Sequence, residues 1–321
     1  AATAATLNVT AGSLVNAPAG AIQSLPGLGG ARNLNAQLDN QGTLTVARAL
    51  TTNKASADHV NTGTIDLTTG DYTIVISGTT PSFTTNGTIN VPTGRTLTLQ
   101  GGVAGGAGQN YHFNGGTLGG AGTVELVNST LVLNTALATS MARLNGSASI
   151  VNGPETLTVS TGTTVPMSNC TLNATTVVDS AGTLQLTNSD QPGPLTSRGV
   201  VEWVGTCTSS GNLGLLTGST TRVLGTASFN AALTCAAGFT NGGTLELTST
   251  GAATAATLAV SAGTLTNAAG ATLRTLVSLG GGRSLLAALD NQGLADFQQT
   301  TALNKAGAAH TNSGTFQMAA T

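Results

Sequence analysis

The sequence predicts an all-β fold, an elongated parallel β-helix (β-solenoid) with coils of about 20–25 residues. Three observations lead to this prediction: a composition with few charges and few aromatic residues, a short strand motif that recurs along the chain, and a long internal repeat.

The composition differs from that of an ordinary globular protein. Of the 321 residues, 10 are Lys or Arg, 12 are Asp or Glu and 44 are Gly, whereas soluble domains usually contain about a quarter charged residues. The net charge of −2 provides no basic surface for nucleic acid. No apolar stretch approaches the ~18–20 residues of a membrane span. The sequence therefore predicts no nucleic-acid partner and no membrane span in this segment.

The recurring motif is Gly-Thr followed by an aliphatic, a variable and a second aliphatic residue. Two apolar residues that flank one outward residue are typical of a short β-strand with one buried face. Asn-Gly or Asn-x-Gly steps before the motif are expected to supply the positive φ that a corner requires. Copies begin at Gly42, Gly63, Gly87, Gly122, Gly182 and Gly243.

We expect the two aliphatic residues of each copy to stack, coil over coil, in continuous core columns. Such a narrow core leaves little room for Trp or Tyr, in agreement with a chain that holds 1 Trp and 2 Tyr. The residues predicted for these columns are Leu44, Val46, Ile65, Leu67, Ile89, Val91, Val124, Leu126, Leu184, Leu186, Leu245 and Leu247.

A much longer repeat has an offset of 251 residues. Residues 1–7 recur as 252–258, residues 38–42 recur as 289–293, and Asn53-Lys54 recurs as Asn304-Lys305. We therefore assign residues 1–251 to one repeat unit of a continuous β-solenoid and residues 252–321 to the start of a second copy. Because the chain begins within the pattern, we expect it to be a mature or excised piece of a longer tandem array.

The spacing of the motif indicates the coil length. Thr64 follows Thr43 by 21 residues, and Thr88 follows Thr64 by 24 residues, so the chain makes roughly 13–15 coils. Residues 284–289 suggest a helix, but their counterpart at residues 33–38 fits a strand and corner better. A β-sandwich array is the competing fold, and it would place hairpin turns about every 8–12 residues.

The Asn-x-Gly-Thr-Leu/Ile coils, as at residues 40–44 and 61–65, with Thr and Asn on the outside, resemble those of bacterial secreted β-solenoid repeat proteins. These are the filamentous-haemagglutinin-type adhesins and autotransporter passengers. The resemblance covers nearly the whole chain as a style of repeat. It implies a right-handed parallel β-helix, export across the cell envelope, and an adhesive or filament-forming role.

Acidic residues are scattered along the chain. Glu155, Asp179 and Glu202 stand 24 and 23 residues apart, so that they would fall on one column of neighbouring coils. Stacked carboxylates raise one another's pKa, which would allow acid–base chemistry. The alternative, which we favour, is that they lie at different corners and solvate the surface. The sequence thus predicts no catalytic residues.

Neither the histidines nor the glycine-rich run has the pattern of a ligand site. His59, His112 and His310 have no Cys or second His nearby in the sequence, as a zinc site would require. We expect them to lie at corners and to bond backbone carbonyls. The glycine-rich residues 101–108 lack the Lys-Ser/Thr of a phosphate loop and indicate a wide bend. The sequence predicts no cofactor and no metal.

The three cysteines leave two interpretations open. Cys207 and Cys235 are 28 residues apart, about one long coil, so that stacking of adjacent coils would bring their α-carbons within disulfide range. Cys170 would then be a buried small hydrophobe or available to another chain. The alternative is three buried thiols.

Outward threonines suggest ice binding, because Thr-x-Thr arrays can order water on a flat face. Residues 43–45, 96–98 and 156–158 have this pattern. Other copies place Asp66, Glu125 or Glu246 at the second threonine position. A flat, lattice-matched face would not tolerate these carboxylates, so ice binding ranks third among the functions.

From the predicted fold we expect a structural segment of an extracellular bacterial fibre or adhesin, secreted or on the cell surface and without catalysis. Its coils would stack end to end into a stiff filament. The expected partners are copies of the same chain, head to tail, and host or surface glycans. The second hypothesis is an exported β-helix that binds or cleaves glycans.

Overall fold

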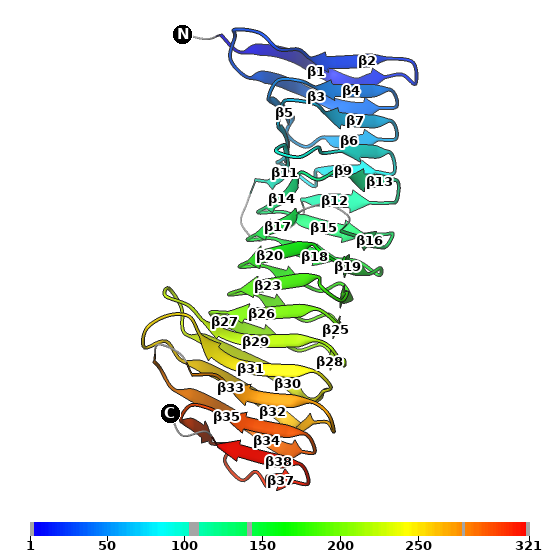
Figure 1. The fold of residues 1–321 in the computed structure, drawn as a ribbon. Helices are drawn as coiled ribbons and strands as arrows, with labels where there is room; N and C mark the ends of the chain where they lie inside the picture. The colour runs from blue at the N-terminus through cyan, green and yellow to red at the C-terminus, as the bar shows by residue number, and fades with distance from the viewer. Residues whose placement is uncertain (1–2, 103–108, 140–142, 278–279, 319–321) are drawn as a thin grey trace. The chain divides into compact units, whose positions relative to one another are not determined.

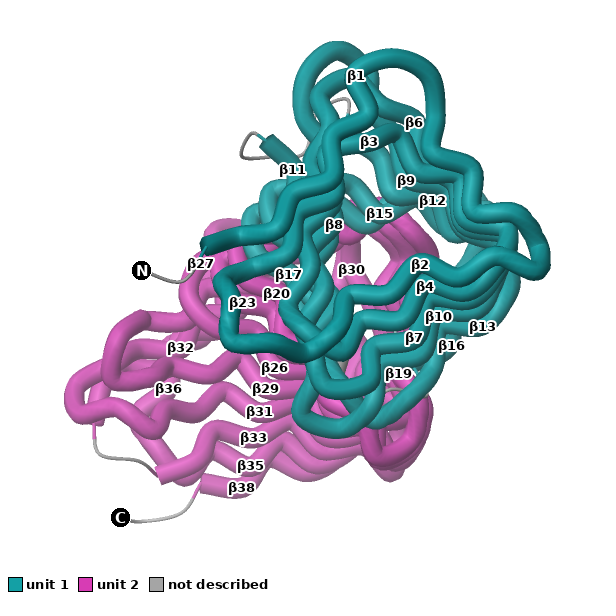
Figure 2. Tube along the Cα trace, turned by 90° about the horizontal axis from the view of Figure 1, so that it is seen from above, with its two compact units in different colours: residues 1–157 teal, residues 158–321 magenta. Residues whose placement is uncertain are grey.

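The computed structural model describes residues 3–102, 109–139, 143–277 and 280–318. Most of the glycine-rich run, residues 103–108, lies outside these ranges, and so does the wide bend predicted there. The chain forms two compact units, residues 1–157 and residues 158–321 (Figure 2).

Both units are β-solenoids. The described residues contain strands and no helix, and the strands stack in parallel, turn upon turn (Figure 1). The two units together contain about 13 turns. The predicted fold class, all-β and a parallel β-solenoid, is confirmed. Residues 284–289, where a helix was the weaker alternative, lie within strand β34 (Arg283–Asn291).

In unit 1 the strands form three parallel columns. The first column follows the order β1, β3, β5, β8, β11, β14, β17, and the second follows β1, β3, β6, β9, β12, β15, β18. The third follows β2, β4, β7, β10, β13 (Figure 2). The bounds are β1 Ala5–Asn16, β2 Ala21–Ser24, β3 Arg32–Asn40, β4 Thr43–Val46, β5 Leu50–Asn53, β6 Asp58–Asn61, β7 Thr64–Leu67, β8 Tyr72–Ile76, β9 Ser82–Thr85, β10 Thr88–Asn90, β11 Thr96–Gly101, β12 Asn110–Phe113, β13 Thr117–Gly119, β14 Thr123–Val127, β15 Thr130–Leu133, β16 Leu137–Ala138, β17 Arg143–Ser147 and β18 Ile150–Asn152.

Unit 2 has the same plan. One column follows β20, β23, β26, β29, β31, β33, β35, β38. The long strands β30, β32 and β34 each contribute their two halves to the other two columns. The bounds are β19 Leu157–Val159 (at the boundary of the units), β20 Thr164–Ser168, β21 Thr171–Leu172, β22 Thr176–Val178, β23 Thr183–Thr187, β24 Asp190–Gln191, β25 Leu195–Ser197, β26 Val200–Val204, β27 Thr206–Ser209, β28 Leu213–Leu215, β29 Thr220–Gly225, β30 Ala231–Asn241, β31 Thr244–Ser249, β32 Ala256–Asn267, β33 Thr272–Thr275, β34 Arg283–Asn291, β35 Leu294–Phe297, β36 Thr301–Leu303, β37 Thr311–Asn312 and β38 Thr315–Met318.

The core consists of the inward side chains of these columns. All twelve aliphatic residues that the motif places in the core are buried, each with 2% or less of its surface exposed. Alternate residues of a strand face opposite sides, so that the aliphatic positions point inward together. Leu44 lies directly above Ile65, and Ile65 above Ile89.

The motif does not lie on a single face, however. Within unit 1, Leu44, Ile65 and Ile89 belong to the column of β4, β7 and β10, whereas Val124 and Leu126 belong to β14 in another column. The motif encodes a strand and the corner that precedes it. Which of the three strand columns it joins depends on the number of residues between this strand and the preceding corner.

The core also contains aromatic residues, contrary to the expectation that it would have little room for Trp or Tyr. Trp203, Tyr72 and Tyr111 are fully buried. The Tyr111 hydroxyl donates to the Ile74 carbonyl (2.7 Å), and the Tyr72 hydroxyl shares a hydrogen bond with Thr52 (2.7 Å). The columns therefore accept large side chains, and the two tyrosines also find a polar partner for their hydroxyl groups.

The glycine that opens each motif has a role other than the predicted one. Gly42, Gly63 and Gly87 do not have positive φ. Instead, a Cβ on Gly63 would lie 2.1 Å from the Gly42 carbonyl oxygen, and a Cβ on Gly87 would lie 2.2 Å from the Gly63 carbonyl oxygen. Each carbonyl accepts the amide of the next coil's threonine, as Gly42 does from Thr64 (2.8 Å). Glycine is needed because successive coils approach closely at this corner.

Candidate functional site

The two copies of the long repeat have the same strand pairing. In the first copy β1 pairs with β3 from Ala5↔Arg32, and the register shifts between Asn8 and Ser13. In the second copy β32 pairs with β34 from Ala256↔Arg283, and the register shifts between Ala259 and Thr264. Every one of these positions differs by 251 residues from its counterpart. The repeat is therefore a repeat of structure as well as of sequence.

A buried ladder of asparagine side chains runs through the corner of each copy. In the first copy Asn16 Nδ2 donates to Asn40 Oδ1 (2.7 Å), Asn40 Nδ2 to Asn61 Oδ1 (2.8 Å), and Asn61 Nδ2 to the Thr85 hydroxyl (3.1 Å). Asn40 and Asn61 are fully buried. A side-chain amide both donates and accepts, so each residue passes the hydrogen bond to the next coil.

The second copy has the matching ladder, which begins one step earlier, at Asn241 in the last coil of the first copy. Asn241 Nδ2 donates to Asn267 Oδ1 (2.9 Å), Asn267 to Asn291 (2.7 Å) and Asn291 to Asn312 (2.6 Å). These amides also donate to a backbone carbonyl of the next coil, as Asn241 does to Thr272 (3.0 Å). The sequence interpretation did not identify this ladder, although an Asn two residues before the motif glycine was a visible signal.

A lysine stabilises the irregular loop of the longest strand in both copies. Lys54 Nζ donates to the Val9 carbonyl (3.0 Å), and Lys305 Nζ donates to the Val260 carbonyl (2.6 Å). Val9 and Val260 lie where the pairing of β1 with β3, and of β32 with β34, shifts its register. The charged ammonium group therefore hydrogen-bonds backbone carbonyls in the irregular part of the long strand.

The equivalent coils of the two copies differ in what covers them. The first coil, strands β1 and β2, exposes 51% of Leu7, whereas Leu258, its counterpart in β32, is fully buried beneath β30. The last coil, strands β36, β37 and β38, exposes 81% of Met318 and 38% of Phe316. Their counterparts Leu67 and Ile65 are fully buried.

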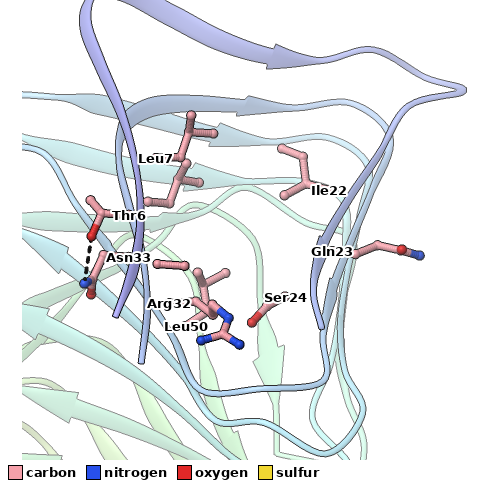
Figure 3. A pocket seen from close by; sticks show the side chains of 10 residues that line it. Thr6, Leu7, Ile22, Gln23, Ser24, Arg32, Asn33 and Leu50 are labelled. Carbon is pink, nitrogen blue, oxygen red and sulfur yellow. Dashed lines mark hydrogen bonds between the residues drawn. The ribbon is translucent and has the colours of Figure 1, made fainter. Parts of the chain in front are cut away.

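The first coil carries an apolar groove of about 260 Å³. Leu7 and Ile22 line one part of it and Ser24, Arg32 and Leu50 another (Figure 3). At its side, Asn33 Nδ2 donates to the Thr6 hydroxyl (3.3 Å) (Figure 3). The groove lies on the inward-facing surface of the first described coil, beside strands β1, β2 and β3.

A column of alternating charges lies on the outer side of unit 2. Arg222 contacts Glu202 (3.1 Å) and Glu246 (2.7 Å), and Arg274 also binds Glu246 (2.9 Å). Glu246 is 1% exposed. Burial alone would lower the pKa of Arg222, but the hydrogen bonds and charges of Glu246 and Glu202 raise it above its ordinary value. The arginines alternate with the carboxylates along this column and neutralise their charge.

The carboxylates considered for catalysis do not stack on one another in unit 2. Glu202 lies opposite Gln185 and Arg222 in strand pairing, whereas Asp179 lies in the turn after β22. Among the described residues, no group of three His, Cys, Asp or Glu side chains is arranged to hold a metal ion.

His59 and His310 accept hydrogen bonds from backbone amides rather than bonding the predicted carbonyls. His59 Nδ1 accepts from the Leu38 amide (3.1 Å), and His310 Nδ1 accepts from the Leu289 amide (3.3 Å). His59 is buried, and this burial lowers its pKa to about 4, while the Asp58 charge acts in the opposite direction. His112 Nδ1 lies 3.4 Å from the side-chain amide nitrogen, Nδ2, of Asn134.

The disulfide considered between Cys207 and Cys235 is not formed. All three cysteines are buried, and each is present as a thiol. Cys207 lies opposite Leu233 in the pairing of β27 with β30, while Cys235 lies opposite Ser209. A displacement of two residues along adjacent strands places the α-carbons about 8 Å apart, beyond disulfide range. Burial raises the pKa of Cys235 to about 12, so this thiol stays protonated.

The threonine pairs considered for ice binding are separated. In unit 1 the pair at residues 43–45 lies in β4 and the pair at residues 96–98 lies in β11, which belong to different columns. Thr45 lies beside Asp66 in the first of these columns, and the Asp66 carboxylate accepts from Asn90 (2.8 Å). These two pairs do not form a single threonine face.

Comparisons with protein-family models, with curated proteins and with solved structures found no match. The class of this protein, a parallel β-solenoid with an internal repeat, is therefore defined by its own geometry. In the described parts of the chain, no helix has the length and apolar character needed to cross a bilayer.

Proposed function

We propose that this chain is a structural segment of an extracellular bacterial fibre or adhesin, built from tandem copies of the long repeat and without a catalytic role. The observation that carries the proposal is the junction of the two copies. Strand β30, at the end of the first copy, pairs in parallel with β32, at the start of the second, from Ala231↔Ala256 to Asn241↔Asn267. One copy thus continues into the next through a shared parallel pairing, with one shift of register between Ala237 and Phe239.

Several properties of the chain support a mechanical role. Backbone ladders, the asparagine ladder and the aliphatic columns all run from coil to coil, so that a load is shared by many parallel contacts. Glu202 and Glu246 are neutralised by arginines, an arrangement that suits coil register better than acid–base chemistry. Secretion and surface location are part of the proposal, and they rest on the resemblance of the coil motif to bacterial adhesins.

The test is electron microscopy of the purified chain and of chains extended by one and two further 251-residue repeats. The expected result is a single uninterrupted solenoid whose contour length increases by an equal increment with each repeat. Separate globules joined by flexible linkers would contradict the proposal, because the copies would then not share one ladder.

Glycan binding is the second candidate, and one groove favours it. Arg48, Asp71 and Arg95 lie beside a surface groove of about 520 Å³ in unit 1. Arginine binds sugar carboxylates or sulfates with paired hydrogen bonds. Thermal stabilisation of the chain by an anionic polysaccharide, lost in Arg48→Gln and retained with the matched variant Arg198→Gln, would favour this role.

A further inference from the structure

A polar groove of about 220 Å³ lies on the outward face of strands β1, β3 and β5 in unit 1. The outward side chains that line it carry amides or hydroxyls and no charge. Asn8 belongs to the same face, since its side chain is hydrogen-bonded to that of Asn35. We call this set of residues the Asn–Thr face: Thr6, Asn8, Asn33, Asn35, Thr51 and Asn53.

The strand pairing arranges the Asn–Thr face in two rows. In the first row Thr6 lies opposite Asn33, and Asn33 lies opposite Thr51. In the second row Asn8 lies opposite Asn35. Neighbours within a row are about 4.8 Å apart, and the two rows are about 6.6 Å apart along the strands. The face therefore presents hydrogen-bonding groups on a regular grid.

Hydrogen bonds within the face use only part of its capacity. Asn33 Nδ2 donates to the Thr6 hydroxyl (3.3 Å; dashed line in Figure 3), and Asn35 Nδ2 donates to Asn8 Oδ1 (3.0 Å). A side-chain amide has two N–H donors and an accepting oxygen, so one bond does not exhaust it. Thr6, Asn8 and Asn35 are exposed, and a ligand on this face can reach them.

The second copy of the repeat shows that coil stacking does not need this chemistry. Its strands β32, β34 and β36 pair as β1, β3 and β5 do. Three of the four amides of the Asn–Thr face are nevertheless absent from it, together with one threonine. At these four positions the second copy has Ala259, Ser284, Leu286 and Ala302. The polar face of the first copy is therefore available for a role other than folding.

The chemistry of the face suits a neutral ligand that is rich in hydroxyl groups. A hydroxyl both donates and accepts hydrogen bonds, as do the amides and threonines of the face. A charged ligand would lose hydration here without gaining an opposite charge. The groove of Arg48, Asp71 and Arg95 differs in this respect, and the two grooves share no lining residue.

The size of the groove favours a polymer. Pockets that enclose a small ligand have volumes of roughly 300–1,000 Å³, and this groove is smaller. It also crosses three successive coils, because β1, β3 and β5 are neighbours in one column. It can hold a segment of a longer chain that lies along the stack of coils.

We propose that the Asn–Thr face of the first copy binds a neutral linear polysaccharide. The amides of both rows hydrogen-bond hydroxyls of successive sugar rings. This inference rests on the adhesive role within the proposed function, for which it names a binding site and a class of glycan.

The test is affinity electrophoresis of the whole chain in native gels that contain dextran, a soluble β-glucan or mannan. An exchanged variant receives the four residues of the second copy: Asn8→Ala, Asn33→Ser, Asn35→Leu and Thr51→Ala. This variant should fold, because the second copy forms the same pairing with these residues. Urea unfolding checks that it does.

At least one of the three polysaccharides should retard the unaltered chain, and the exchanged variant should bind it at least about tenfold more weakly. The single variant Asn35→Leu should bind it about threefold more weakly. Its matched control is Asn90→Leu, which also removes an exposed asparagine that donates one hydrogen bond, here to Asp66 (2.8 Å). This control should leave the affinity unchanged, and the single pair decides the matter if the exchanged variant does not fold.

The proposal is overturned if none of the three polysaccharides retards the chain, or if Asn35→Leu and a folded exchanged variant bind as tightly as the unaltered chain. Retardation by heparin alone, an anionic polysaccharide, would also overturn it and would favour the groove of Arg48.

The electron microscopy of extended chains distinguishes these failures from that of the proposed function. If the joined repeats form one solenoid but no neutral polysaccharide binds, only the ligand is wrong. If the joined repeats form separate globules, the proposed fibre fails whether or not a polysaccharide binds.

Discussion

Residues 5–67 and residues 256–318 are two copies of one sequence pattern in two different surroundings. They share the pairing of their strands, the shift of register, the lysine contact and the asparagine ladder. They differ in burial: Leu7 and Phe316 are partly exposed, whereas their repeat equivalents Leu258 and Ile65 are buried. The local sequence thus sets the conformation of a coil, and its neighbours set how much that coil contributes to stability.

The same comparison distinguishes His59 from its repeat equivalent, His310, by their burial. His59 is covered by the next coil and buried, whereas His310, in the last coil, is exposed, although both accept a hydrogen bond from the equivalent backbone amide. A pair of equivalent residues therefore tests one variable, the presence of the covering coil.

The largest effect is expected for Gly63→Ala. Its Cβ would lie 2.1 Å from the Gly42 carbonyl oxygen, and the coils on both sides would have to separate. The free energy of unfolding should fall by at least about 4 kcal/mol, measured by urea unfolding. Gly314→Ala makes the same local clash with Gly293 but should affect only the last coil. Equal losses in the two variants would contradict the comparison.

The next effect is expected for Leu258→Ala, which removes a fully buried side chain from between β30 and β34. The free energy of unfolding should decrease by about 2–5 kcal/mol. The matched variant Leu7→Ala should cost less than about 1 kcal/mol in the monomer, because Leu7 is 51% exposed. Urea unfolding at low protein concentration measures both.

The stability of the first copy should depend on pH through His59. Its pKa is lowered from 6.5 to about 4, so the unfolded chain binds more protons than the native chain between these values. The contribution of His59 is complete above pH 6.5 and decreases as the pH falls toward 4. The expected loss is up to about 3 kcal/mol.

Two glutamine variants isolate this contribution. His59→Gln keeps an acceptor for the Leu38 amide and should reduce the slope of unfolding free energy against pH. Asn53→Gln, at an exposed position of the same copy, changes no titratable group and should leave the slope unchanged. The idea fails if the two variants have the same slope.

In the asparagine ladder, a variant at a buried position should lower the free energy of unfolding more than a variant at an exposed position. Asn61→Ala removes an acceptor from Asn40 and a donor to Thr85 within the buried corner. This change should cost about 2 kcal/mol. Asn312→Ala, at the exposed end of the second ladder, should cost less than about 0.5 kcal/mol. Hydrogen exchange of the adjacent corner amides would show where protection is lost.

The smallest difference is expected for the lysines. Lys54→Met and Lys305→Met each remove a charged donor to two backbone carbonyls in the loop of the long strand. Both should cost about 1 kcal/mol, because both partners lie within the copy itself. A large difference between the two variants would show that the covering coils also matter at this loop.

Much of the fold could be predicted from the sequence. The spacing of Gly-Thr motifs predicted parallel coils, and the alternation within each motif identified the inward residues, such as Leu44 and Ile65, which are buried. Both signals are local, because side chains alternate across a strand whatever the strand packs against.

Other features could not be predicted in this way. The faces occupied by Leu44 and Val124 depend on the chain between motifs, and the offset of Cys207 from Cys235 depends on register between coils. The role of Gly63 was misassigned, because a close approach to Gly42 has no local signature that distinguishes it from a positive φ.

The sequence by itself determined the strands, their inward faces and the 251-residue repeat, since these follow from alternation and identity along the chain. Only the tertiary structure decided which face each motif joins, which asparagines and histidines are buried, and which coils are exposed. Those properties depend on distances between coils that are 20 or more residues apart, such as the 21 residues that separate Asn40 from Asn61. The stacking of whole coils establishes such distances, and no single segment contains them.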